Sequence, residues 1–144
     1  MKEERSIAAV VYCGDQYLLL KYGLGHWGFV KGHQEIGESD KETILRELQE
    51  ETGITDAEII GDFKTHFDYY FNFKREKIHK SVTCYLIESK TKRVVLSFEH
   101  EDYIWLPIEK ALKLASFDNS KNILKKAVAY RKGSLDSFLN SKSK

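Results

Sequence analysis

The acidic residues between Gly32 and Ile54 are spaced in a way that points to metal chemistry. Glu50 and Glu51 come three and four positions after Glu47, so on a helix they would share one face with it. Like charges at that spacing repel by about 0.2–0.5 kcal/mol per pair, and a helix that keeps them usually has a cation to bind. Carboxylate oxygens are the ligands that Mg²⁺ and Mn²⁺ prefer. We therefore expect Mg²⁺ on this helix, with Mn²⁺ as the alternative.

A single helix must position these carboxylates, and both of its ends are marked in the sequence. Ser39, with Glu42 three residues later, is typical of a capping box at a helix start. Gly53 is typical of the residue that follows a helix end. The apolar stripe that packs this helix on the core is predicted to be Ile44, Leu45 and Leu48.

The rest of the chain is predicted to form strands and helices of one α/β layered domain, residues 1–144. We expect a hairpin tip at 72–77, and Trp27 and Trp105 in the core. Gly133 is expected to end the last helix, before a tail with apolar residues at 135, 138 and 139. Strands are predicted at 7–12, 17–22, 27–30, 58–70, 78–88 and 103–106, and helices at 107–115 and 120–132.

Charge and composition indicate the cellular compartment and the kind of partner to expect for this protein. The net charge of +1 gives no overall field that would draw the protein to nucleic acid or to a membrane. No apolar run approaches the roughly 20 residues of a spanning helix, and the charged first residues are not typical of a signal peptide. Cys13 and Cys84 lie in apolar runs and are interpreted as reduced, buried thiols. These features predict a cytoplasmic protein.

The acidic run resembles the Nudix box, the signature of hydrolases that act on a nucleoside diphosphate linked to another moiety. Every fixed position of that box is filled. The resemblance implies an α/β Nudix fold, in which a mixed β-sheet is sandwiched between α-helices and the box forms a loop-helix-loop. The matching residues are Gly32-x5-Glu38-x7-Arg46-Glu47-Leu48-x-Glu50-Glu51-x-Gly53-Ile54.

The resemblance also implies roles for the box residues in an attack of water on phosphorus. Glu47, Glu50 and Glu51 would hold the metal, and Gly32 belongs to the same set. Glu47 is also a candidate general base. Arg46 cannot bind a cation and is interpreted as a residue that holds a box carboxylate in place for catalysis. The supporting residues are Glu38 and Gly53.

One further carboxylate lies outside the box. Glu99 matches a family glutamate that completes the metal shell or serves as the base, and a solvated loop is the alternative. For Glu38 the alternative is support of the helix N-terminus. For the three box glutamates the alternative is a solvated acidic face.

The flanking residues resemble the asymmetrical diadenosine tetraphosphate hydrolases within that family. The resemblance is carried by residues 26–33 (HWGFVKGH), 96–100 (LSFEH) and 103–106 (YIWL). Val30 stands where that subfamily has proline. The resemblance implies cleavage of diadenosine tetraphosphate into ATP and AMP, and it matches Lys80 to a lysine that contacts phosphate.

A dinucleoside polyphosphate needs cations for its phosphates and aromatic faces for its bases. Lys31, His33 and His26 could hold phosphates. Tyr69 or Tyr70 is expected to stack on adenine, and Phe117 is a second stacking candidate. Ordinary packing on a strand is the alternative for these aromatic residues.

Three other functions remain open. An RNA 5′-pyrophosphohydrolase would use the same metals with a basic groove, for which residues 74–80 could supply a small patch. A hydrolase that removes non-canonical nucleoside triphosphates would need a closed base pocket. A non-catalytic Nudix module would commonly lack box glutamates. We expect a small-molecule partner, no membrane, no obligate nucleic acid, and either a monomer or a homodimer.

Overall fold

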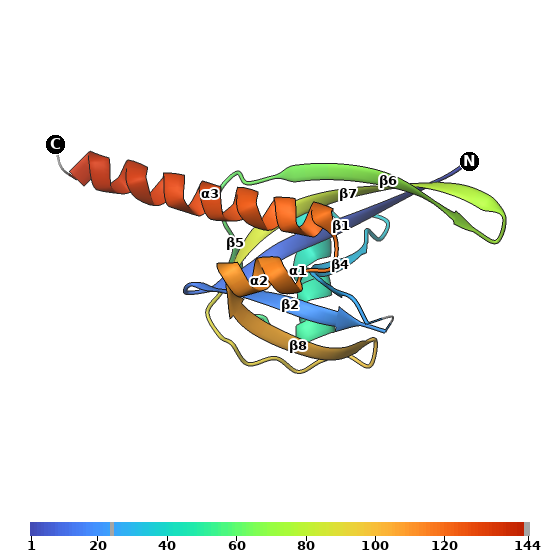
Figure 1. Cartoon of the computed structure of the whole chain (residues 1–144), viewed down its shortest axis with the longest axis horizontal. Helices are drawn as coiled ribbons and strands as arrows, with labels where there is room; N and C mark the ends of the chain where they lie inside the picture. The colour runs from blue at the N-terminus through green and yellow to red at the C-terminus, as the bar shows by residue number, and fades with distance from the viewer. Residues whose placement is uncertain (24, 143–144) are drawn as a thin grey trace.

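The computed structural model describes the backbone of residues 1–23 and 25–142, and the side chains of residues 1–23 and 25–133. Strands and helices together give the expected α/β class (Figure 1). The helices are α1 (Asp40–Thr52), α2 (Ile108–Leu114) and α3 (Asp118–Lys142). The strands are β1 (Lys2–Cys13), β2 (Gln16–Tyr22), β3 (Trp27–Gly28), β4 (Val30–His33), β5 (Ala57–Ile59), β6 (Thr65–Phe73), β7 (Glu76–Ser89) and β8 (His100–Pro107).

One mixed sheet organises the molecule around β1 and β7. These two strands run parallel, from Lys2 opposite Ile78 to Tyr12 opposite Glu88. All other pairs are antiparallel: β2 and β4 pair with β1, β5 and β6 pair with β7, and β3 and β8 pair with β2. The β6–β7 hairpin projects beyond the rest of the sheet at the end opposite to the C-terminus (Figure 1).

Both faces of the sheet are buried, because successive side chains of a strand point to opposite faces. On β1, Val10 packs under α2 and α3, whereas Val11 packs under α1. Trp27 and Trp105 are partly buried, and each packs against one of these two cores. The predicted arrangement of a sheet between helices is therefore confirmed. No helix in the described part of the chain is both long and apolar enough to cross a membrane.

Helix α1 begins and ends as predicted. The Ser39 side chain accepts a hydrogen bond from the Glu42 backbone, and the Glu42 side chain accepts one from the Ser39 backbone. Gly53 takes the left-handed backbone conformation, with φ of 73°. The predicted apolar stripe is wrong in one member, since Leu45 is 39% exposed. That position turns away from the sheet, and Ile44 and Leu48 alone fill the core from this helix.

Three predicted boundaries are wrong for local reasons. The single strand expected at 58–70 is divided into β5 and β6, because Gly61 adopts a φ of 56° and breaks the extended chain. The tip of the next hairpin is only Lys74 and Arg75, both at positive φ, as a two-residue turn requires. Gly133 does not end α3, because its backbone stays helical. The tail side chains at 135, 138 and 139 lie outside those described.

Cys13 and Cys84 are both free thiols. Cys84 is fully buried in the core beneath α3, and burial raises the pKa of its thiol to about 12. The prediction that both are buried is wrong for Cys13, which is only partly buried.

Candidate active site

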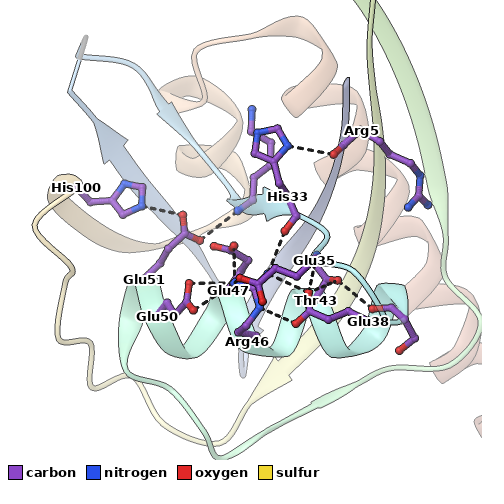
Figure 2. A network of polar contacts seen from close by, with 12 residues as sticks. Arg5, His33, Glu35, Glu38, Thr43, Arg46, Glu47, Glu50, Glu51 and His100 are labelled. Carbon is purple, nitrogen blue, oxygen red and sulfur yellow. Dashed lines mark hydrogen bonds and ion pairs between the residues drawn. The ribbon is translucent and has the colours of Figure 1, made fainter. Parts of the chain in front are cut away.

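Arg46 lies at the centre of the acidic cluster and binds three carboxylates, two on α1 and one just before it (Figure 2). Its Nε donates to Glu38 Oε2 at 2.7 Å, and its Nη2 donates to Glu38 Oε1 at 3.1 Å. Its Nη1 donates to Glu47 Oε1 at 3.0 Å and to Glu50 Oε2 at 3.1 Å. These bonds raise the pKa of Arg46, and the guanidinium lowers the pKa of Glu38 to about 2. Arg46 is thus placed to set the rotamers of these side chains, as we expected of a positioning residue.

Glu51 is the buried member of the set, and both of its oxygens have partners. Its Oε2 accepts a hydrogen bond from the Lys31 backbone N–H at 3.2 Å. Its Oε1 lies 2.9 Å from Nε2 of His100. Burial, followed by the charges of Glu47 and Glu99, raises the pKa of the Glu51 carboxyl to about 8. Burial also lowers the pKa of His100. Burial and the neighbouring carboxylates therefore outweigh the positive charge of Lys31 at Glu51.

At Gly32, strand β4 comes into direct contact with a side chain of helix α1. A β-carbon built on Gly32 would lie 2.0 Å from Cδ of Glu47, so only glycine leaves room for this carboxylate. Gly32 therefore lies directly beside Glu47, and its part in binding a metal stays a prediction.

The loop between β7 and β8 forms hydrogen bonds to the C-terminal end of α1. Its backbone N–H groups at Val95 and Ser97 donate to the carbonyls of Thr52 and Glu51, at 2.9 and 3.2 Å. The exposed Glu99 follows in the same loop, and its charge raises the pKa values of both Glu47 and Glu51. Glu99 thus affects the acidic cluster electrostatically, and its role as metal ligand or base stays a prediction.

The carboxylate oxygens of this acidic cluster are suitable ligands for a hard divalent cation. Carboxylate oxygens suit Mg²⁺ and Mn²⁺, and a cation would relieve the repulsion that raises the pKa of Glu51. Among the residues that the structure describes, no three His, Cys, Asp or Glu side chains already surround one point. Arg46 engages Glu47 and Glu50, while Glu51 turns toward Lys31 and His100.

A cavity of about 280 Å³ lies on the other face of the sheet, between the strands and the start of α3. The His26 ring stacks on Tyr22 at 5.2 Å and is tilted against Phe117 at the same distance. Tyr69 stacks on Phe67 at 6.1 Å between ring centroids. The aromatic and polar lining includes His26, Lys31, Phe67, Tyr69, Phe117 and Ser120.

Two lysines place positive charge beside this cavity. Lys31 lines it directly, and burial followed by the charge of Lys80 lowers the pKa of Lys31. Lys80 lies opposite Tyr69 in the β6–β7 ladder and is buried, with Nζ 3.5 Å from Glu4 Oε2. The cavity therefore combines aromatic faces with cations, the pair of features expected for a nucleotide.

Two predicted substrate residues lie away from this cavity. Tyr70 points to the opposite face of the sheet from Tyr69 and stacks on His79 at 4.7 Å. His33 Nδ1 lies 3.3 Å from the Arg5 carbonyl oxygen, and His33 does not line the cavity.

The contact between His100 and Glu51 was not predicted. His100 follows Glu99 in a polar segment, and nothing in its neighbours indicates burial. An isolated histidine beside a candidate metal glutamate is the one signal that could have drawn attention to it.

Comparisons with known proteins assign the chain to one family. Residues 2–127 match the family model described as NUDIX domain. The asymmetrical bis(5′-nucleosyl)-tetraphosphatase of Rattus norvegicus is 41% identical over 113 residues, which are 76% of each chain. The protein of the same description from Caenorhabditis elegans is 31% identical over 82% of this chain and 86% of its own.

A solved structure extends the similarity to three dimensions. The crystal structure of a C. elegans Ap4A hydrolase binary complex matches with a TM-score of 0.76 and 29% sequence identity. The match covers 90% of this chain and 98% of that one. The span of the family match includes the α1 carboxylates and the residues that line the cavity.

Proposed function

This chain belongs to the Nudix family, and from that premise we propose that it hydrolyses dinucleoside polyphosphates, diadenosine tetraphosphate foremost. Three relatives that are 41% identical to it over 76% of their length bear the description of asymmetrical bis(5′-nucleosyl)-tetraphosphatases. We propose the same asymmetric cleavage here, with ATP and AMP as products.

The observation that carries this proposal is the position of Lys31. Its backbone N–H donates to Glu51 on the α1 side, while its side chain lines the aromatic cavity on the other side. One residue therefore joins the acidic cluster to the nucleotide-sized cavity. A substrate whose base enters the cavity would pass its phosphates along Lys31 and Lys80 toward the glutamates.

Nudix hydrolases generally need a divalent metal ion, and we propose Mg²⁺ here, with Mn²⁺ as a substitute. The residues that would hold it are Glu47, Glu50, Glu51 and Gly32. When bound there, the ion would neutralise phosphate charge and lower the pKa of the attacking water.

The chain's own side chains orient this reaction. Arg46 holds Glu47 and Glu50 through hydrogen bonds and is itself held by Glu38, which limits the rotamers of both ligands. Glu47 and Glu99 are the candidate bases that would take a proton from the attacking water. Glu99 is exposed beside the cluster, so it has access to solvent that Glu51 lacks.

The cavity would hold one nucleoside and so select which phosphorus is attacked. Tyr69 and Phe117 offer aromatic faces for a base, and His26 lies between Tyr22 and Phe117. A base anchored at a fixed distance from the glutamates gives one cleavage position in the phosphate chain.

The proposal also covers the setting in which the enzyme works. We propose a single domain over residues 1–144, a cytoplasmic location, and a monomer or homodimer that acts on small molecules. The small net charge of +1 and the two free thiols support this setting.

A substrate comparison tests the function. kcat/KM should be measured with Mg²⁺ on diadenosine tetraphosphate, on ATP and on 5′-triphosphorylated RNA at one enzyme concentration. The proposal predicts the highest value for diadenosine tetraphosphate. A higher value for the RNA would assign the chain to the 5′-pyrophosphohydrolases, and a higher value for ATP would favour nucleoside triphosphate hydrolysis.

A further inference from the structure

His100 is a buried histidine that contacts the buried glutamate of the acidic cluster. The side chain of His100 is 2% exposed and that of Glu51 is 5% exposed. The two meet at 2.9 Å between Nε2 and Oε1, as Figure 2 shows. Lys31 donates to the second oxygen of Glu51 from its backbone. The carboxylate is therefore held on both oxygens from the protein side.

A β-bulge places His100 at this position. In the β2–β8 ladder, Lys21 lies opposite Asp102, whereas the next residue, Tyr22, lies opposite His100. Glu101 is the extra residue, and it points to the surface, where it lies 3.7 Å from Lys21 Nζ. A bulge redirects the side chains around it, and bulges are frequent beside active sites. Here the bulge allows His100 to face inward while Glu101 faces out.

An aromatic contact with Tyr22 also fixes the orientation of the His100 ring. The rings of Tyr22 and His100 meet edge to face, with centroids 4.7 Å apart and an interplanar angle of 84°. The hydroxyl of Tyr22 donates to the Phe29 carbonyl, which anchors the tyrosine in turn. The ring of His100 therefore has one orientation toward Glu51, set by packing and by the strand register.

These contacts leave Glu51 suited to bind a cation. An ionised carboxylate only accepts hydrogen bonds, and each of its oxygens has two lone pairs. Lys31 uses one lone pair, and His100 uses another in the tautomer that carries its proton on Nε2, so each oxygen keeps one lone pair for a ligand bond. We propose that His100 is a positioning residue that fixes the Glu51 carboxylate, with a lone pair left on each oxygen for a cation, and thereby sets metal affinity. This inference rests on the proposed function, since it takes Glu51 as a metal ligand.

Two variants of similar size separate hydrogen bonding from packing. His100→Gln keeps an N–H donor near the position of Nε2, and His100→Leu fills the same space without a donor. Mn²⁺ affinity of the protein without substrate should be measured by the electron paramagnetic resonance signal of free Mn²⁺. Thermal unfolding of the metal-free variants is recorded in parallel. Should His100→Leu fail to fold, His100→Asn replaces it, because the shorter amide does not reach Glu51.

We expect His100→Leu to weaken Mn²⁺ binding by about 10- to 100-fold, the usual effect of removing a partner behind a metal ligand. His100→Gln should stay within about threefold of the wild type, with both variants melting at similar temperatures. Equal Mn²⁺ affinity in the Leu variant (or its Asn replacement) and the wild type would overturn the proposal, as would equal weakening in the Gln variant.

Glu51→Gln, measured in the same assay, separates this inference from the proposed function. Loss of Mn²⁺ binding in Glu51→Gln with unchanged binding in His100→Leu would refute the role of His100 and leave the metal site standing. Unchanged binding in Glu51→Gln would refute Glu51 as a metal ligand, and the role of His100 with it.

Discussion

The α-carbon of Gly32 faces the carboxylate of Glu47 with no space for a side chain between them. A β-carbon at this position would lie 2.0 Å from Cδ and 2.2 Å from Oε1 of Glu47. Glycine is therefore required here by a close approach between β4 and α1, and its φ is not in the left-handed region. The contact concerns the far end of a flexible side chain, so Glu47 can move aside without disrupting the sheet.

Gly32→Ala should therefore leave the fold intact and displace a proposed metal ligand. We expect kcat to fall by about 100-fold or more, because a displacement of about 1 Å at a catalytic group can have such an effect. Circular dichroism and steady-state kinetics on diadenosine tetraphosphate would measure both quantities. Gly23→Ala is the matched control, because a β-carbon on Gly23 meets no heavy atom within 4 Å. Equal activity in the two variants would show that the placement of Glu47 is not important.

Glu51→Gln should separate activity from stability. Without metal, burial and the charges of Glu47 and Glu99 raise the pKa of Glu51 from 4.5 to about 8. The folded state then binds more protons than the unfolded state between these pH values, so the unfolding free energy falls as pH rises. The neutral amide removes this fall, and the metal-free variant should melt at or above the wild-type temperature near pH 8.

The activity of the same variant should fall by several orders of magnitude at saturating Mg²⁺. Thermal unfolding from pH 5 to 8 and kinetics would provide the two measurements. Retention of more than about a tenth of wild-type activity would contradict the role of Glu51 as a metal ligand.

The helix that carries the acidic residues could be predicted because its signals are local. The capping box at Ser39 and the left-handed Gly53 depend on residues within a few positions of each end. The parallel pairing of β1 with β7 joins residues about seventy-five positions apart, and no local pattern encodes it. Gly133 could not be interpreted correctly, since a glycine ends a helix only where the backbone turns left-handed.

The site residues likewise include some that local sequence signals predict and some that depend on tertiary structure. Glu47, Glu50 and Glu51 follow from helical spacing, and Glu99 from a motif match. Tyr69 and Tyr70 could not be distinguished, because neighbouring strand residues point to opposite faces and either face could have held the cavity. His100 required the β2–β8 bulge, which is a property of two strands and not of its own segment.

Tyr69→Ala should weaken substrate binding, whereas Tyr70→Ala should not. Tyr69 lines the cavity, and stacking of a base on an aromatic ring contributes roughly 1–3 kcal/mol, or about 5- to 150-fold in KM. Tyr70 faces the other side of the sheet and is the matched control. Michaelis–Menten kinetics of both variants would decide the point. A larger effect at Tyr70 would place the nucleotide on the face that carries His79.

His79 should make stability depend on pH near neutrality. Its Nε2 lies 2.8 Å from Asp68 and its Nδ1 lies 2.6 Å from Glu3. Only the protonated ring can donate to both, and the hydrogen bonds to Asp68 and then Glu3 raise its pKa above 6.5. The stabilisation is therefore complete below pH 6.5 and is lost as pH rises through the folded-state pKa.

An NMR titration of the His79 ring would measure this pKa directly. Asp68→Asn should lower it, because the amide keeps an acceptor oxygen but removes the negative charge that stabilises the protonated ring. Glu76→Gln changes the same charge on the same hairpin without contacting His79 and should change it much less. A His79 pKa at or below 6.5 in the wild type would contradict the ion-pair arrangement between β1, β6 and β7.

The identity of the products tests the central claim most directly. Diadenosine tetraphosphate should be hydrolysed with Mg²⁺ in ¹⁸O-labelled water. The products are then separated by chromatography, and their masses are measured by mass spectrometry. The cavity would hold one base at a fixed distance from the glutamates. We therefore expect equal amounts of ATP and AMP, with the label in only one of them. Two molecules of ADP, or no turnover with Mg²⁺ or Mn²⁺, would contradict the account.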